Sequence, residues 1–359
     1  MSQRLAILGV GLIGGSIGLA ARERGLAEVT GYVRNPNKAE DCLRLKAVDR
    51  IAVTIEEAVA EADIVICCAS VGSLAEMAKT ALDAAGPDCV VTDVGSTKQE
   101  LVEAVGGDER FIGGHPLAGA ETAGVANARA DLYEGARWCL TPTETSSGVL
   151  YDRIQRLVID LGARPMAIEA SEHDRAIAVV SHLPHIFANQ LATQGRPGTE
   201  RLGGLAPSLR DATRVAGSNP AIWGEIFSTN HEAVVEAINL SISGLQQAAE
   251  VIGSADPERI TTWQAAAAVE RSALSGAETE GEATHQLRVL VPNQPGVLAE
   301  LALALGRAGV NITDMSLDPT PDMTSGAISI WVAGEAESDK AVACISELGH
   351  SVTPANEAS

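Results

Sequence analysis

The stretch RLAILGVGLIGGSIGLAARE, residues 4–23, decides the fold of the N-terminal part of the chain. A short apolar run is followed by three glycines in the G-x-G-x-x-G spacing and then by a helical pattern. Glycines between a strand and a helix allow a tight turn and let a pyrophosphate approach the positive N-terminal end of the helix. We therefore predict a dinucleotide-binding turn rather than a purely structural one. The predicted cofactor contacts in it are Gly9, Gly11, Leu12, Ile13 and Gly14.

The pattern beyond this stretch predicts an α/β chain of three domains. β-branched apolar runs alternate with helical patterns as far as residue 165, which indicates βαβ units and a parallel sheet. Residues 170–252 are helical in pattern, and Asp256-Pro257-Glu258 opens a last helix. After the small acidic linker 275–284 the order is βαββαβ. We predict a Rossmann-type domain (1–165), an all-α domain (166–275) and a C-terminal βαββαβ domain (284–359).

Composition excludes several classes of partner. The 47 Asp and Glu residues against 26 Lys and Arg residues give a net charge of −21, which repels nucleic acid and anionic membrane surfaces. Any small anion must then be bound by a few local cations and backbone N–H groups. The six cysteines form no CxxC pair, which favours reduced thiols and a cytoplasmic setting. We expect neither a signal peptide nor a membrane span.

The residues after the second predicted strand bear on the choice of cofactor. An NAD site usually has an acid there for the ribose hydroxyls, whereas this chain has Val33-Arg34-Asn35. Arg34 is able to pair with a 2′-phosphate, which favours NADP, although an exposed arginine beside a turn is nearly as good an interpretation. Asp93, at the end of a later strand, is included among the predicted cofactor contacts.

Two loops at strand ends carry candidate catalytic groups. Ser96 and Lys98 lie in DVGSTK, and His115 lies in GGHPLAG. Ser96 would bond a substrate hydroxyl or, with Gln99, form an S-x-x-Q capping box. Lys98 would hold an anion. His115 is a candidate base, because nothing around it has the apolar periodicity of a core residue.

The helix that follows carries His173, Asp174, Ser181, His182 and His185. Asp174 and His185 share one face but lie about 16 Å apart along the axis, so they do not touch. Pro184 should kink the helix between His182 and His185, which suggests the wall of a site. We expect no metal, since HExxH is absent. Arg214 alone would be a solvated surface cation.

Five ordered motifs carry a family resemblance. GVGLIGGS, DVGSTK, GGHPLAGAETAG, HDRAIAVVSHLPH and RVAGSNPAIW resemble the prephenate and arogenate dehydrogenases of tyrosine biosynthesis over residues 1–275. The tail from His285 resembles an ACT domain, a regulatory module that commonly binds amino acids at a turn such as NQPG. The corresponding residues here are Asn293, Pro295 and Gly296.

The resemblance implies NAD(P)-dependent oxidative decarboxylation of prephenate to 4-hydroxyphenylpyruvate. In that family His115 would accept the proton of the ring hydroxyl and Ser96 would orient it. Arg214 would hold the ring carboxylate, and His185 would contact the side chain of the substrate, which favours prephenate over arogenate. The remaining residues of the expected substrate site, as wall or supporting groups, are Glu121, Asp174, His182 and Trp223.

The resemblance also implies a homodimer formed by the helical domain and feedback by an aromatic amino acid, most simply tyrosine. Three alternatives remain: an arogenate dehydrogenase, another short-acid dehydrogenase or imine reductase of the same plan, and a non-catalytic sensor of NADP and amino acids. The histidine in GGHP argues against the second, because such enzymes use a Lys or Asp on the helical domain. The retained base and carboxylate-binding group argue against the third.

Overall fold

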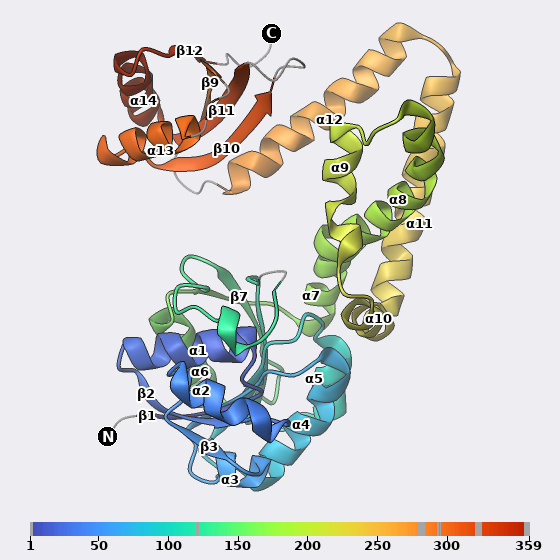
Figure 1. Cartoon of the computed structure of the whole chain (residues 1–359). Coiled ribbons are helices and arrows are strands. Elements are labelled where there is room, and N and C mark those ends of the chain that lie inside the picture. The colour runs from blue at the N-terminus through green and yellow to red at the C-terminus, as the bar shows by residue number, and fades with distance from the viewer. Residues whose placement is uncertain are drawn as a thin grey trace. The chain divides into compact units, whose positions relative to one another are not determined.

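A computed structural model describes residues 3–119, 122–278, 284–292, 294, 296–319 and 325–354 (Figure 1). The chain forms two compact units, Met1–Leu245 and Gln246–Ser359. The boundaries of the three predicted domains stay predictions.

The first unit is built on an eight-stranded sheet with the order β3-β2-β1-β4-β5-β6-β7-β8. Neighbouring strands are parallel except for the antiparallel pair β6 and β7. The strands are β1 (Gln3–Leu8), β2 (Ala27–Tyr32), β3 (Arg50–Ala52), β4 (Ile64–Cys67), β5 (Val90–Asp93), β6 (Phe111–Pro116), β7 (Arg137–Thr141) and β8 (Arg164–Ala167). The predicted Rossmann-type sheet is confirmed. The short strands β3 and β8 were not predicted, because neither RIA nor RPMA contains a run of β-branched apolar residues.

Helices cover both faces of this sheet. Along β1, Leu5 and Ile7 pack into one core with residues of α1 and α6, and Ala6 and Leu8 pack into the other with residues of α3, α4 and α5. This alternation follows from the two-residue period of a strand. The helices are α1 (Leu12–Glu23), α2 (Ala39–Arg44), α3 (Ile55–Val59), α4 (Val71–Ala84), α5 (Gln99–Val105) and α6 (Gly148–Asp160), with 3-10 turns at Pro36–Lys38 and Val125–Asn127.

The glycine turn lies where the strand order reverses. The chain adds β2 and β3 on one side of β1 and then crosses to β4 on the other, so a crevice opens beyond β1 and β4. Gly9 has φ +107°, and a Cβ there would lie 2.1 Å from the carbonyl oxygen of Cys68. A Cβ on Gly14 would lie 2.2 Å from the carbonyl oxygen of Gly9, whereas one on Gly11 would meet nothing within 4 Å. Gly9 and Gly14 therefore permit close packing, and Gly11 leaves open space beside the start of α1.

Helices follow the sheet, as predicted for residues 170–252. They are α7 (Ala170–Ile177), α8 (Leu183–Leu202), α9 (Pro207–Thr213), α10 (Pro220–Thr229) and α11 (His231–Gly253), which continues into the second unit. One π-helical turn, η3 (Ala178–His182), joins α7 to α8, and a 3-10 turn, η4 (Arg214–Gly217), precedes α10. The expected effect of Pro184 takes another form: the proline occupies the first turn of α8, where it needs no N–H partner, directly after the π turn.

The second unit contains the predicted βαββαβ order. Its elements are α12 (Pro257–Glu278), β9 (Thr284–Pro292), α13 (Val297–Arg307), β10 (Ile312–Pro319), β11 (Ser325–Ala333), α14 (Glu335–Glu347) and β12 (Ser351–Pro354). The strands form an antiparallel sheet in the order β10-β11-β9-β12, and its core packs against α13 and α14. In the described part of the chain, no helix is long and apolar enough to cross a membrane.

Candidate active site

A cavity of about 500 Å³ lies over the glycine turn. It is lined by Gly9 and Gly11–Gly14, by the ends of β4 and β5, by part of the loop after β6, and by Ile222, Glu225 and Ile226 of α10. Glu225 also accepts a hydrogen bond from the Gly72 N–H in the first turn of α4, at 3.1 Å. The helical region therefore helps to form the wall of the cavity over the strand ends. This is where a dinucleotide lies in a sheet of this topology.

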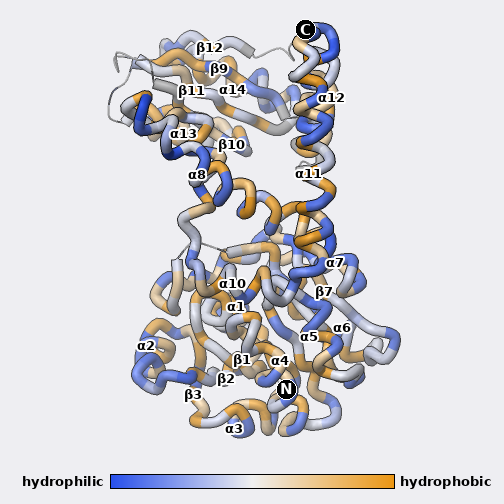
Figure 2. The backbone as a smooth tube through the Cα atoms, turned by 90° about the vertical axis from the view of Figure 1, so that its right-hand side faces the viewer, coloured by the Kyte–Doolittle hydropathy of each residue, from blue (hydrophilic) through white to orange (hydrophobic). Residues whose placement is uncertain are grey.

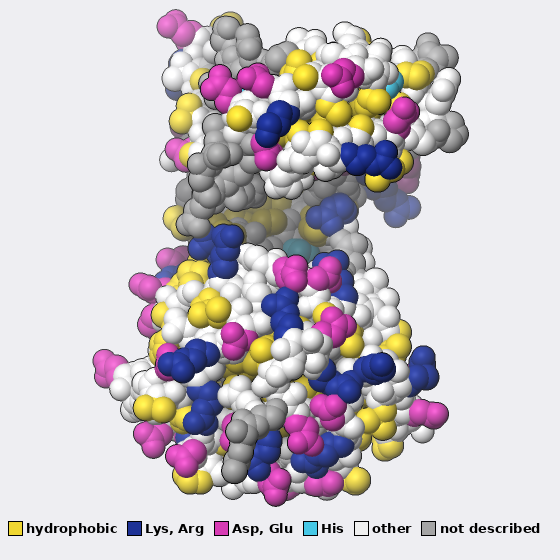
Figure 3. Space-filling view, turned by 90° about the vertical axis from the view of Figure 1, so that its left-hand side faces the viewer, with side chains coloured by type: hydrophobic (Ala, Val, Ile, Leu, Met, Phe, Trp, Pro, Cys, Tyr) yellow, Lys and Arg dark blue, Asp and Glu magenta, His cyan; other side chains and the backbone are white. Residues whose placement is uncertain are grey.

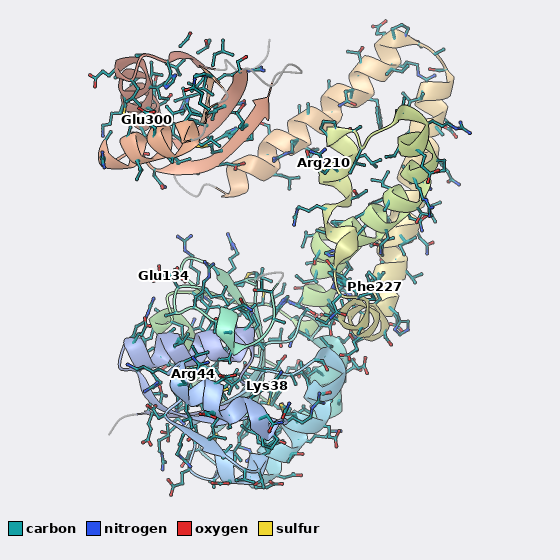
Figure 4. All side chains as sticks on the ribbon, in the orientation of Figure 1. Lys38, Arg44, Glu134, Arg210, Phe227 and Glu300 are labelled. Atoms are coloured by element: carbon teal, nitrogen blue, oxygen red, sulfur yellow. The ribbon has the colours of Figure 1, made fainter. Side chains whose placement is uncertain are left out.

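A second cavity of about 330 Å³ shares Gly9 and Gly11 with the first. It extends along the residues after β2, where Val33, Arg34, Asn35 and Lys38 line it. Figure 4 labels Lys38 among these residues. The lining includes two cations and no carboxylate among the described residues. An anionic group beyond the ribose would therefore meet positive charge.

Asp93 and Lys98 do not lie where the sequence predicted them. Both side chains are fully buried and form an ion pair with each other. Asp93 also accepts hydrogen bonds from the N–H groups of Gly95 (2.7 Å) and Gly114 (2.9 Å). The expected cofactor contact of Asp93 and the expected anion contact of Lys98 are therefore corrected. Because Asp93 lies on β5 and accepts a hydrogen bond from Gly114 on β6, its carboxylate links the two strands. The ion pair and the hydrogen bonds offset the cost of burying its charge.

Ser96 lines the larger cavity and does not form the predicted capping box with Gln99. The helix α5 begins at Gln99, and Asp174 of α7 caps it. Its carboxylate accepts hydrogen bonds from the N–H groups of Lys98 (2.8 Å) and Gln99 (2.9 Å). Because a side chain distant in sequence satisfies these orphan N–H groups, the Ser96 side chain is available to the cavity.

His115 lies on β6. This strand pairs with β5, which leads into the loop that carries Ser96. Its Nδ1 is 2.9 Å from Nε2 of His173, and the two rings meet edge to face. Burial, with the nearby His173, Lys98 and His182, holds the pKa of His115 well below its usual range. His115 is therefore neutral near pH 7, as a general base must be.

His185 and Trp223 form the core of a second group of side chains. The His185 ring stacks on Trp223 with ring centroids 3.5 Å apart. Its Nδ1 lies 3.1 Å from the carbonyl oxygen of Ser181, and its Nε2 lies 3.4 Å from the Ser218 hydroxyl. Burial lowers the pKa of His185, and the positive charge of Arg214 lowers it further. The exposed Arg214 guanidinium is therefore within electrostatic range of His185.

Asn230 connects Asp174 of α7 to the group of side chains around His185 and Trp223. Its amide donates to the carbonyl oxygen of Asp174 (2.9 Å) and to Nδ1 of His182 (3.2 Å). The His182 ring meets Trp223 edge to face, with ring centroids 5.8 Å apart. Burial lowers the pKa of His182 from 6.5 to about 4. His182 and Asp174 are both buried, and their place in the substrate site stays a prediction.

Three predicted site residues lie outside the described residues: Glu121 of the expected substrate site, and Asn293 and Pro295 of the expected effector turn. Gly296 has φ +95° and caps the N-terminus of α13. The left-handed conformation favours glycine there. Gly296 thus lies at the start of this helix as expected, and the effector turn and its ligand stay predictions.

His173 and Asn230 are residues that the sequence did not assign. His173 was recognised on its helix but not linked to His115, 58 positions away, and Asn230 sits in a helical pattern with no motif around it. A histidine directly before an aspartate at the start of a helix was the available signal for His173. Asn230 gave none, because its position between α10 and α11 becomes important only through tertiary contacts.

Charge and cysteine chemistry add little to the site. Figure 3 shows Lys and Arg interspersed with Asp and Glu on one face of the sheet-bearing part of the molecule. All six cysteines are unpaired, and four of them are buried. Within the described ranges no group of three or more His, Cys, Asp and Glu is placed to hold a metal ion.

The chain matches three family models along its length. They are the prephenate dehydrogenase nucleotide-binding domain (residues 17–167), the prephenate dehydrogenase dimerization domain (169–265) and the ACT domain (285–349). A curated prephenate dehydrogenase of Bacillus subtilis is 29% identical, with 96% of each chain covered. A cyclohexadienyl dehydrogenase of Zymomonas mobilis is 30% identical over 71% of this chain and 90% of that protein.

A solved structure gives the same assignment. The prephenate dehydrogenase of A. aeolicus, in complex with hydroxyphenyl propionate and NAD+, is 30% identical with a TM-score of 0.70, covering 76% of this chain and 99% of that chain. The sheet, the helical region and the βαββαβ unit thus correspond, in order, to the parts of one family of oxidoreductases. On this evidence the chain belongs to the prephenate dehydrogenase family.

Proposed function

We propose that the protein is a prephenate dehydrogenase that converts prephenate to 4-hydroxyphenylpyruvate and carbon dioxide. The observation that carries the proposal is the cavity that brings together the glycine turn, Ser96 and helix α10. A dinucleotide and a small substrate would meet in it. The resemblance of five motifs and the 30% identity to family members support the substrate assignment.

The cavity fits a nicotinamide dinucleotide. Gly11 leaves open space next to the first turn of α1, where the N–H groups and the helix dipole favour a pyrophosphate. Ile222 and Ile226 supply an apolar wall for a planar ring. When bound, the dinucleotide would supply an oxidised nicotinamide ring as the acceptor for the hydride on the ring carbon that bears the hydroxyl group.

His115 would act as the base. Its ring accepts the proton of the ring hydroxyl while Ser96 orients that hydroxyl. The carbon–carboxylate bond then breaks, carbon dioxide leaves, and the bonding electrons make the ring aromatic. The proton on His115 returns to the ring oxygen, so the reaction takes up and releases no net proton. The lowered pKa of His115 suits this role, since the base must be neutral before each turnover.

Arg214 and His185 would bind the two carboxylates. The guanidinium of Arg214 offers a planar pair of donors to the ring carboxylate, a geometry that Lys reproduces poorly. His185, held by Trp223 and Ser218, would contact the side chain of the substrate. We propose prephenate rather than arogenate as the better substrate, because the last histidine of SHLPH is present.

The enzyme should accept NADP as well as NAD. Arg34 and Lys38 line the cavity after β2, and its lining includes no carboxylate among the described residues to repel a 2′-phosphate. This cavity supports the cofactor assignment independently of the reaction.

We also propose that the protein is a homodimer with amino-acid feedback. Hydrophobic side chains of α11 are exposed, among them Val235, Leu240, Ile242 and Leu245, and hydrophobic and hydrophilic segments alternate along this helix (Figure 2). Such a face suits association with a second copy. The Gly296 turn of the ACT domain would hold the effector, with tyrosine as the first candidate.

Steady-state kinetics tests the proposal. Purified protein given prephenate should form reduced cofactor and carbon dioxide in equal amounts, and arogenate should react more slowly. His115→Asn should lower kcat by a factor of about a hundred or more. The matched control is His231→Asn, which replaces an exposed histidine on α11. Absence of turnover with either cofactor would refute the proposed reaction, and full activity of His115→Asn would refute the assignment of the base.

A further inference from the structure

One ring nitrogen of His115 is engaged by a second histidine. His115 Nδ1 lies 2.9 Å from His173 Nε2, and His173 Nδ1 lies 2.7 Å from Asp174 Oδ1. His173 is 1% exposed and Asp174 is 2% exposed. Three titratable side chains from β6 and α7 thus form one buried line that ends in a carboxylate.

The carboxylate sets the direction of every hydrogen bond in this line. Asp174 also accepts from the N–H groups of Lys98 and Gln99, so it acts as an acceptor toward all its neighbours. His173 must then carry its proton on Nδ1 and present a lone pair on Nε2. That lone pair accepts from His115 Nδ1–H. His115 Nε2 is therefore left without a proton, which is the state a base needs.

We propose that His173 and Asp174 are positioning residues that fix His115 in its Nδ1–H tautomer and stabilise the charge that it gains. The proposal rests on the proposed function, in which His115 accepts the hydroxyl proton. When Nε2 takes that proton, His115 becomes an imidazolium whose Nδ1–H still donates to His173. The Asp174 carboxylate then acts on this charge through the His173 ring. The proton leaves Nε2 again when the ring oxygen of the product takes it.

The surroundings strengthen this effect. Water is excluded from His173 and Asp174, so their hydrogen bonds act in a medium of low dielectric constant. Asn230 donates to the Asp174 carbonyl oxygen and Asp174 caps α5, which together hold α7 against the loop that carries Ser96. The line is therefore fixed to the same loop that would orient the substrate hydroxyl.

The test replaces His173, because Asp174→Asn would also weaken the cap of α5. His173→Phe keeps a ring and removes both nitrogens, whereas His173→Gln keeps an oxygen acceptor near the position of Nε2. His231→Gln is the control, since His231 is exposed and its Nδ1 lies 3.0 Å from the Ser228 carbonyl oxygen. Unfolding midpoints of all three variants establish that each is folded.

With prephenate and NAD, His173→Phe should lower kcat by about tenfold to a hundredfold and leave the KM for prephenate within about twofold. His173→Gln should recover part of the loss, and His231→Gln should match the wild type. A wild-type kcat in His173→Phe, or a raised KM with kcat unchanged, would overturn the proposal.

A second measurement does not depend on turnover. Long-range ¹H–¹⁵N NMR spectra of protein with ¹⁵N-labelled histidines distinguish the two tautomers of each ring. His115 should carry its proton on Nδ1 in the wild type and should lose that preference in His173→Phe. If the wild type fails to oxidise prephenate but shows this tautomer, only the proposed function fails. If His115 carries its proton on Nε2 at neutral pH, the proposed positioning by His173 and Asp174 is wrong.

Discussion

The buried histidine His182 makes the stability of the first unit depend on pH. Its folded-state pKa is about 4, against 6.5 for an ordinary histidine, because burial disfavours the charged ring. The unfolded chain therefore takes up a proton first as the pH falls. The stabilisation is complete above pH 6.5 and is lost progressively between pH 6.5 and about 4.

The magnitude follows from the same two values. Within this window each pH unit costs about 1.4 kcal/mol, so lowering the pH from 7 to 5 should remove about 2 kcal/mol of stability through His182 alone. His182→Asn keeps an oxygen for the Asn230 amide and cannot titrate. It should be less stable than the wild type at pH 7, since it loses the edge contact with Trp223, but it should lose about 2 kcal/mol less on acidification.

Urea unfolding followed by tryptophan fluorescence at pH 7, 6 and 5 measures this difference. His231→Asn serves as the control, because it removes a histidine that is exposed. The control should follow the wild type at every pH. Equal pH dependence of the wild type and His182→Asn would refute the reasoning, since it would mean that burial of His182 does not disfavour its charged form.

Four further substitutions separate binding from folding. Gly9→Ala should lower the unfolding midpoint, because its Cβ would lie 2.1 Å from the Cys68 carbonyl oxygen at φ +107°, whereas Gly11→Ala should keep the midpoint and weaken cofactor binding measured by titration. Arg214→Gln should raise the KM for prephenate about tenfold or more with a smaller change in kcat, and an unchanged KM would remove Arg214 from the substrate site. Arg34→Asp should lower kcat/KM with NADP at least about tenfold relative to NAD, and an unaltered ratio would show that Arg34 does not contact the 2′-phosphate.

Local patterns were sufficient to predict the fold of both units. The alternation in β1 and the glycine turn after it are encoded within about twenty residues, and the βαββαβ order needs only the periods of its own segments. The candidate base could also be predicted, because His115 lies in a glycine-rich stretch with no apolar period, although the structure places it on strand β6 rather than in a loop. The features that identify this histidine as a candidate base belong to its immediate neighbours in the sequence.

The partners of the site residues could not be predicted in the same way. Asp93 and Lys98 looked like ligands because they follow a strand end, yet they are five residues apart and fold back on each other in the interior. Ser96 and Gln99 satisfied the spacing of a capping box, but Asp174 takes that role from 75 positions away. His173 meets His115 across 58 positions. Such pairings depend on which helix packs against which strand end, and one sequence does not reveal that.

The cap supplied by Asp174 has a consequence for chimeric enzymes. A helical region exchanged between relatives to alter substrate choice would bring its own residue 174, while α5 and its loop stay with the recipient. If the donor lacks an acceptor there, the N–H groups of Lys98 and Gln99 lose their partner and the Ser96 loop loses its anchor. Such a graft should begin after Asp174 rather than at the end of the sheet, so that the recipient keeps its own cap.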